Sequence, residues 1–313
     1  MKTLITGATG FIGRHLVQNG CIAMVRKPSG FPEEVIANLL DKKSLISACD
    51  GVETIIHCAG FSRETGKENE SQHWQINFEG TRNLLYAAQE AGVKKFVFLS
   101  TVKAMAHPGS DCAAEDWAGE PVGHYGKAKR AAEKAVLELN KSGLLETVIL
   151  RPAMVYGSGR RSNLERLAKG IQAGWFPILP DTENRRSFLN IKDLIDAIWM
   201  VAKRSEANGK IYIVADTQCY SGRAICELIR ASLPQSRMPW IISEKQLRYV
   251  GKLGDLLGKF LFRPFPVNSE VVSRLIDSEC YSSSRIQTEF GWQPKIGLQE
   301  GLKMLLTNSA DKA

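Results

Sequence analysis

The feature of this sequence that most constrains its fold is a glycine-rich turn close to the N-terminus. The apolar stretch from Lys2 to Thr6 runs directly into three glycines spaced three apart, and a short helical pattern follows. The first glycine permits a tight turn, the second lets the backbone approach a pyrophosphate, and the third lets helix and strand pack closely. Free N–H groups at the start of the helix favour phosphate there. The turn predicts a dinucleotide site formed by Gly7, Thr9, Gly10, Phe11, Ile12 and Gly13.

Short apolar runs alternate with helical patterns through the first half of the chain. Strands are predicted at 2–6, 22–26, 54–57, 95–100 and 147–151, and helices at 74–90 and 125–140. This alternation is typical of parallel βαβ units. We therefore predict an α/β fold: a Rossmann-type, doubly wound parallel sheet with a smaller, discontinuous C-terminal substrate lobe. The dinucleotide-binding domain is expected over 1–156 plus 186–216, and the substrate lobe over 157–185 and 217–313.

Composition excludes several classes of protein. No apolar run reaches the roughly 20 residues of a membrane span, and no secretory signal pattern precedes the first strand, so we expect a cytoplasmic protein. The 7 cysteines are scattered without a CxxC pair, which favours buried free thiols over a disulfide framework or a metal site. The net charge of +8 suits a phosphate-rich ligand, and no basic, aromatic-interleaved stripe indicates nucleic acid.

A catalytic group is predicted around Tyr125. Lys129 lies four residues further on, so both side chains share one helical face. A nearby ammonium lowers the pKa of a phenol, which can then exchange a proton with a substrate oxygen near neutral pH. Thr101 ends the fourth strand, where ligands of such sheets bind, and we expect it to hold the same oxygen. Its neighbour Ser100 is predicted to contact substrate.

The residues after the second strand bear on the choice of dinucleotide. An acidic residue there would bind the ribose 2′-hydroxyl of NAD, whereas an arginine accommodates the 2′-phosphate of NADP. This chain has Arg26 and no carboxylate, so NADP(H) is favoured over NAD(H). Asn38 and Leu39 are expected to border the adenine, and Asp41 is expected to cap the helix that follows it.

Taken together, these motifs resemble the extended short-chain dehydrogenase/reductase family, also called the NAD-dependent epimerase/dehydratase family. The resemblance runs nearly end to end and also includes the segments 57–60, 77–83, 93–101, 151–157, 186–193 and 290–294. It implies that Ala59 and Gly60 line the cofactor, that Pro152 packs beside the nicotinamide, and that Asn77 shapes the site or ties a helix to the core. It also implies substrate-phosphate contacts from Arg186 and, by a looser match, Arg274, and a homodimer.

The resemblance leaves several activities open. Val102 and Lys103 stand where similar sugar 4,6-dehydratases carry Asp-Glu, which argues against dehydration, and Met154 stands where hexose 4-epimerases often have asparagine. Reduction of a 4-keto nucleotide sugar is favoured. A UDP-sugar 4-epimerase with tightly bound NAD is the second alternative, reduction of a non-sugar ketone the third, and a non-catalytic dinucleotide sensor the fourth.

One further segment is amphipathic. Between Gln246 and Phe265, leucines and other apolar residues recur at helical spacing and alternate with lysines and arginines. A basic amphipathic helix can lie on anionic lipid. We instead favour a helix that packs on the core of its own lobe or covers the substrate site, and we expect no membrane contact.

Overall fold

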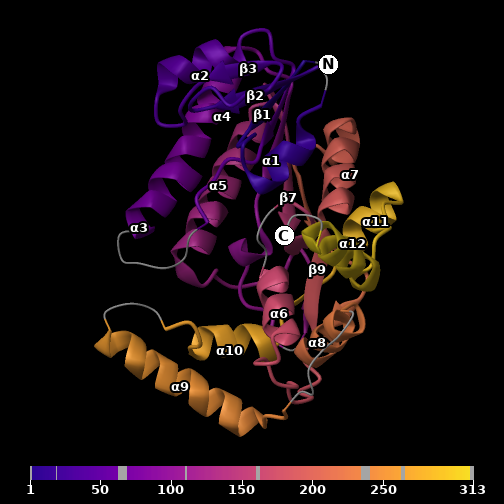
Figure 1. The fold of residues 1–313 in the computed structure, drawn as a ribbon. Helices are drawn as coiled ribbons and strands as arrows, with labels where there is room; N and C mark the ends of the chain where they lie inside the picture. The colour runs from indigo at the N-terminus through magenta and orange to yellow at the C-terminus, as the bar shows by residue number, and fades with distance from the viewer. Residues whose placement is uncertain are drawn as a thin grey trace.

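The computed structural model describes residues 2–18, 20–62, 69–109, 111–159, 163–233, 240–261 and 265–310. Its centre is a parallel sheet of seven strands in the order β10-β7-β5-β4-β1-β2-β3 (Figure 1). The strands are β1 (Thr3–Thr6), β2 (Cys21–Val25), β3 (Glu34–Ile36), β4 (Thr54–His57), β5 (Lys95–Leu99), β7 (Glu146–Pro152) and β10 (Lys210–Val214). The predicted fold class is confirmed, and so are the five predicted strands. β3 had no signal in the sequence.

Side chains alternate across this sheet and build a core on each face. In β5, Val97 and Leu99 join one core, which α1 (Phe11–Leu16), α7 (Ile191–Ala202) and α11 (Ser284–Phe290) cover. Phe96 and Phe98 join the other core, beneath α2 (Lys42–Cys49), α4 (Gly80–Glu90) and α5 (Gly123–Lys141). The side-chain period of two along a strand therefore produces the doubly wound arrangement. Asp41 caps α2 as predicted, accepting a hydrogen bond from the backbone of Lys43.

The predicted helix at 74–90 has an unexpected first part. After α3 (Asn69–Gln72), residues His73–Glu79 form a π-helix, η1, and the α-helical turns begin only at Gly80. Such π segments occur frequently at functional sites. The segment places His73 and Asn77 close enough for a 3.3 Å contact between their side-chain nitrogens.

Segments that follow β7 build the second lobe, and its helices α6 (Asn163–Gln172), α8 (Gly222–Ala231), α9 (Glu244–Phe260) and α10 (Ser269–Ile276) lie in the lower part of Figure 1. Its core joins Tyr156, Phe188 and Ile225 to the apolar faces of the surrounding helices. The strands β8 (Met154–Tyr156), β9 (Arg186–Asn190) and β11 (Cys219–Tyr220) and the helix α12 (Leu298–Ala310) also contribute side chains to this core. β8 and β9 fall within the residues predicted for the dinucleotide-binding domain, so the boundary between the lobes stays a prediction. The described residues also form two short 3-10 helices, η2 (Val102–Ala104) and η3 (Ser205–Ala207).

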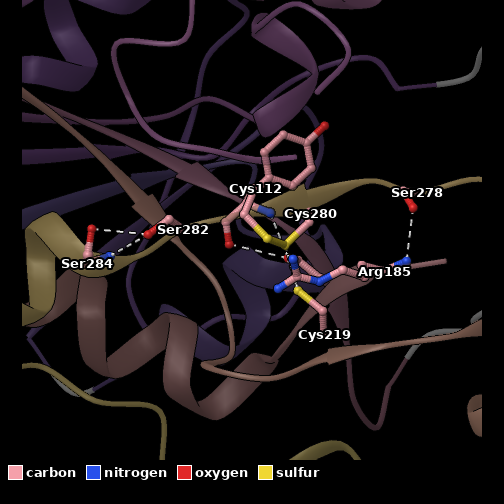
Figure 2. Close-up of a disulfide and its surroundings, with 9 residues drawn as sticks. Cys112, Arg185, Cys219, Ser278, Cys280, Ser282 and Ser284 are labelled. Atoms are coloured by element: carbon pink, nitrogen blue, oxygen red, sulfur yellow. Dashed lines mark hydrogen bonds between the residues drawn. A yellow bond between two sulfur atoms is a disulfide. The ribbon is translucent and has the colours of Figure 1, made fainter. Parts of the chain in front are cut away.

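The expectation of free thiols throughout is wrong at one place. β6 (Cys112–Ala113) and β12 (Cys280–Tyr281) pair in parallel, with Cys112 opposite Cys280, and their sulfur atoms form a disulfide. The sulfur of Cys219 lies 2.8 Å from that of Cys280 (Figure 2). The partners are 168 residues apart in sequence, and a two-residue strand pairing of this kind leaves no periodic signal. Cysteine spacing therefore could not indicate the bond.

The amphipathic segment packs on its own lobe, as favoured, but only through a narrow face, and most of its apolar side chains stay exposed. The segment forms α9, whose buried residues are Leu247, Gly251 and Gly254. Leu256 is 64% exposed and Phe260 is 80% exposed. Within the described ranges, no helix is both long enough and apolar enough to cross a bilayer.

Candidate active site

A cavity of about 580 Å³ opens where four neighbouring strands end. Gly7 follows β1, Gly60 follows β4 by three residues, Thr101 follows β5, and Pro152 ends β7. The order of strands reverses between β1 and β4, and crevices at such reversal points are the usual ligand sites of open α/β sheets. The predicted residues that line this first cavity are Gly7, Thr9, Gly10, Phe11, Ile12, Gly13, Gly60, Ser100, Thr101, Tyr125, Lys129 and Pro152.

The glycine turn has the geometry of a phosphate cradle. Gly7 has φ +69°, and a Cβ added to it would lie 2.7 Å from the backbone nitrogen of Ala59. A Cβ on Gly13 would lie 2.1 Å from the carbonyl oxygen of Gly7. Only glycine fits at both positions, and the closely packed backbone leaves N–H groups at the start of α1 for an anion. The residues present therefore fit a dinucleotide.

A one-way chain of hydrogen bonds positions the cofactor-side loop after β4. The hydroxyl of Thr81 donates to the carbonyl of Asn77, and His57 Nε2 lies 2.9 Å from that hydroxyl. His57 Nδ1 lies 2.6 Å from the hydroxyl of Thr6, which accepts from the backbone N–H of Ala59. These directions are consistent only if His57 carries its proton on Nε2. Burial, with a smaller contribution from the charge of Lys129, holds the pKa of His57 well below its usual range, so the ring stays neutral.

Asn77 connects the π-helix to the loop that follows β4. It is fully buried in η1, and its amide donates to the carbonyl of Phe61 at 2.8 Å. Its carbonyl accepts from the backbone N–H of Phe61 at 2.7 Å. This double contact ties the π-helix to the loop and shapes the wall of the cavity, because a Cβ on Gly60 would lie 3.0 Å from the Asn77 oxygen.

Tyr125 and Lys129 lie on one face of α5, as predicted, and both line the first cavity. Lys129 is buried, and its ammonium donates to the carbonyl of Leu99 at 2.8 Å and lies 4.5 Å from the centre of the Phe98 ring. Burial lowers its pKa to about 8, although Cys58 and Glu133 oppose that shift. The ring of Tyr125 lies 5.6 Å from that of His73. The charge that would favour a tyrosinate is therefore present below about pH 8.

The hydroxyls of Ser100 and Thr101 have different partners. Thr101 accepts from the backbone N–H of Lys103 at 3.2 Å, and its own hydrogen remains for donation into the cavity. Ser100 donates instead to Glu133 at 2.6 Å. Glu133 also binds Arg151 through both carboxylate oxygens, at 2.9 and 2.7 Å, and both side chains are 2% exposed. The buried Glu133–Arg151 pair thus ties the end of β5 to α5 and β7, and sequence patterns did not reveal it.

The two predicted phosphate-binding arginines line a second cavity of about 620 Å³. Tyr125 lines both cavities and therefore stands at their junction. Arg186 is buried, donating to Glu279 at 2.7 Å and to the carbonyl of Asp277 at 3.2 Å. Arg274 is half-exposed and pairs with Glu270 within α10. Sequence reasoning missed the participation of Lys103, His73 and Glu279 in this cavity, since they come from three separate segments.

The remaining predicted cofactor residues lie outside the first cavity. Arg26 is exposed directly after β2, and Ala37, which precedes Asn38, donates its N–H to the carbonyl of Val25. Asn38 caps its own turn by accepting from the N–H of Leu40, and Leu39 is buried. Ala59 is half-buried beside Gly60. Arg26 and Asn38 thus lie at the carboxyl ends of adjacent strands.

Comparison with known proteins agrees with this geometry. The model of the NAD dependent epimerase/dehydratase family matches residues 3–215, and the chain belongs to that family. It is 29% identical to a UDP-glucose 4-epimerase of Vibrio cholerae, over 96% of this chain and 93% of the relative. It is 26% identical to a 2-alkyl-3-oxoalkanoate reductase of Stenotrophomonas maltophilia, over 99% and 100%. The solved structure of MoeE5 in complex with UDP-glucose and NAD shares the fold, with a TM-score of 0.78 and 21% identity over 100% of this chain and 99% of that one.

Proposed function

We propose that this protein is an NAD(P)-dependent oxidoreductase that reduces the keto group of a sugar carried on an anionic group, most specifically a 4-keto nucleotide sugar. The observation that carries the proposal is the position of Tyr125 at the junction of two cavities. One cavity holds the glycine cradle, and the other holds Arg186 and Arg274. In that position the phenol of Tyr125 can contact the keto oxygen of a substrate whose anionic group lies at the arginines of the second cavity.

The chain's own residues handle the proton. A bound nicotinamide would supply the hydride to the carbonyl carbon. Thr101 donates a hydrogen bond to the carbonyl oxygen, and Tyr125 transfers its phenolic proton to that oxygen as the hydroxyl forms. The Lys129 ammonium stabilises the resulting tyrosinate, which takes a proton from solvent before the next turnover. The hydroxyl of Ser100 faces Glu133, so we assign it to holding the end of β5 in place.

To bind either arginine, a substrate phosphate would have to displace the carboxylate that the arginine already pairs with, and the cost differs between Arg274 and Arg186. Arg274 shares a partly exposed pair with Glu270, and such pairs contribute at most about 1 kcal/mol. Arg186 is buried against Glu279, and separating a buried pair costs several kcal/mol. We therefore assign the direct phosphate contact to Arg274 and a positioning role to Arg186.

Turnover tests this proposal. Oxidation of NADPH would be followed by absorbance with 4-keto nucleotide sugars, for the wild type, Tyr125→Phe and the exposed control Tyr86→Phe. We expect Tyr125→Phe to slow hydride transfer by about 10²- to 10⁴-fold, the size of general acid–base catalysis. Its NADPH affinity and the rate of Tyr86→Phe should match the wild type. Equal rates for both variants would refute the role of Tyr125, and no turnover by the wild type would favour the dinucleotide sensor.

A UDP-sugar 4-epimerase is the second candidate, and the epimerase from Vibrio cholerae favours it. An epimerase must keep its cofactor to return the hydride, whereas a reductase must exchange it. Acid extraction of the purified protein followed by mass spectrometry separates the two: retained NAD supports epimerisation, and an empty or NADPH-selective site supports reduction. Similarity to the reductase from Stenotrophomonas maltophilia supports reduction of a non-sugar ketone as the third candidate.

A further inference from the structure

A third cavity, of about 510 Å³, lies in the C-terminal lobe beyond the two arginines. Arg186 and Arg274 line both it and the second cavity, so the two spaces meet at these guanidinium groups. A substrate whose keto group lies at Tyr125 and whose anionic group lies at Arg274 would place whatever follows that anion in the third cavity. The residues that line the third cavity therefore indicate the chemistry of the substrate group beyond the anion.

Those walls are almost wholly apolar. Helices α6, α8, α9 and α10 contribute aliphatic side chains, and Trp175, Phe176 and Trp240 contribute aromatic ones. Among the described residues that line it, the only charged side chains are Arg166, Arg186 and Arg274, and no amide, hydroxyl or carboxylate side chain is present. A nucleoside would bury base and ribose groups that need hydrogen-bond partners, and burying them unpaired is costly. A hydrocarbon chain has no such requirement.

The helix that bounds this cavity points its large apolar residues outward. In α9, glycines occupy the inner face, since a Cβ on Gly254 would lie 1.7 Å from the carbonyl of Val267. The outward residues include Leu253 (41% exposed), Leu256 (64%) and Phe260 (80%). Val250 is 40% exposed and also lines the cavity, so the outer surface and the cavity share a wall. In Figure 1, α9 forms the lower edge of the molecule.

Charge on α9 is arranged for one kind of partner. At about 3.6 residues per turn, Lys245, Lys252 and Lys259 form a stripe directly beside the exposed apolar face. Arg248 lies on the same stripe, but its guanidinium is already paired with Glu244 and Asp277. An apolar face flanked by lysine and arginine matches the boundary between the acyl chains and anionic headgroups of a membrane. The chain's net charge of +8 likewise favours contact with an anionic surface.

We propose that the substrate carries a hydrocarbon chain on its anionic group, that this chain occupies the third cavity, and that the outer face of α9 rests on the anionic lipid surface from which the chain comes. Trp175 (61% exposed) and Trp240 (51%) both line the cavity and lie partly open to solvent, as expected at the boundary between lipid and water. The inference rests on the proposed hydride transfer at Tyr125. It changes the proposed substrate in one respect: a hydrocarbon chain takes the place of the nucleoside.

Ligand binding tests the cavity without requiring turnover. Farnesyl diphosphate and uridine diphosphate share a diphosphate and differ in what is attached, so calorimetric titration of the NADP⁺-loaded chain compares the two attachments directly. We expect farnesyl diphosphate to bind at least about tenfold more tightly. Val271→Trp on α10 and Leu167→Trp on α6 line the cavity and would fill it, which should weaken farnesyl diphosphate by about tenfold and leave NADPH affinity unchanged.

Tighter binding of uridine diphosphate would overturn this part of the proposal, and so would cavity variants that bind farnesyl diphosphate as the wild type does. Should either tryptophan variant fail to fold, the comparison of the two ligands on the wild type decides alone. Binding of farnesyl diphosphate with no hydride transfer to any ketone would refute the proposed function and leave the cavity assignment standing. Turnover of a soluble nucleotide sugar without affinity for farnesyl diphosphate would refute the cavity assignment and leave the proposed function standing.

Vesicle sedimentation tests α9. The full chain should sediment with vesicles of phosphatidylcholine and phosphatidylglycerol, bind more weakly to phosphatidylcholine alone, and dissociate as salt rises. Leu256→Glu/Phe260→Glu should reduce binding by about tenfold or more, whereas Leu144→Glu, a 65% exposed leucine after α5, should not. Absence of vesicle binding by the wild type, or equal binding by all three proteins, would overturn the assignment. A change from dimer to monomer in the α9 double variant alone would also overturn it, because the face would then contact a second copy of the chain.

Discussion

The buried Glu133–Arg151 pair allows a quantitative test of how the end of β5 is held. Glu133→Leu removes the carboxylate that binds Arg151 through two oxygens and accepts from Ser100. Among the described residues, the guanidinium then keeps one hydrogen-bond partner, the carbonyl of Glu115 at 3.1 Å. Breaking a buried pair by removing one partner costs about 3–5 kcal/mol.

That cost translates into a measurable change in melting temperature. Globular proteins unfold with an entropy of about 2.1 cal/mol/K per residue, or roughly 0.66 kcal/mol/K for 313 residues. A loss of 3–5 kcal/mol therefore lowers Tm by about 5–8 °C. Differential scanning calorimetry of the cofactor-free protein measures it, without contributions from ligand binding.

The double variant Glu133→Leu/Arg151→Met is the matched control, because it removes both charges and keeps apolar volume. Replacement of a whole buried pair by apolar residues is often neutral, so the double variant should recover more than half of the lost Tm. A Tm drop below about 1 °C for Glu133→Leu, or a double variant no more stable than the single one, would refute the reasoning. The first result would mean that solvent reaches Arg151, and the second that the lost stability comes from packing rather than from the unpaired charge.

Three further results are expected from single groups. Burial lowers the pKa of Lys129 from 10.5 to about 8, so between these pH values the unfolded chain binds more protons than the folded chain. The unfolding free energy of the wild type, relative to that of Lys129→Met, should therefore rise as pH increases from about 8 to about 10.5, and urea titrations would measure the rise. Arg26→Glu should weaken NADPH by about tenfold or more and leave NADH affinity nearly unchanged by fluorescence titration, and equal losses for both would contradict a 2′-phosphate contact. Gly7→Ala should abolish dinucleotide binding, because its Cβ meets Ala59, whereas Gly143→Ala, at φ +74° in open space, should only lower stability by about 1–2 kcal/mol; similar binding by both would argue against the cradle.

Local patterns predicted the parts of the site that depend on neighbouring residues in sequence. The glycine turn follows from three residues within one βα unit, and the shared face of Tyr125 and Lys129 follows from helical spacing alone. The end of β5 followed from an apolar run that stops at a hydroxyl. Parallel strands place their carboxyl ends at one edge, so these separate local predictions come together in a single cavity.

Contacts between distant segments could not be predicted in this way. The Cys112–Cys280 disulfide and the Arg186–Glu279 pair both depend on how residues near 280 return to the β6–β9 region, and nothing periodic marks that return. The π-helical start of the helix at Asn77 is equally hidden, since its composition suits an α-helix. The feature that accompanies it is a tertiary contact, the hydrogen bond between Asn77 and the backbone of Phe61.

The helix α9 shows why an amphipathic pattern does not by itself say which face is buried. Leucines at helical spacing predict an apolar face, and the usual partner of such a face is the core of the same lobe. In this helix Gly251 and Gly254 lie on the opposite side, and only a glycine face lets α9 approach the backbone at Val267. Close backbone packing therefore places the glycines inward together with Leu247, and leaves Leu253, Leu256 and Leu257 outward. Two glycines three residues apart therefore mark the side of α9 that packs against its own lobe, and the exposed apolar and basic side is the one that we propose rests on lipid.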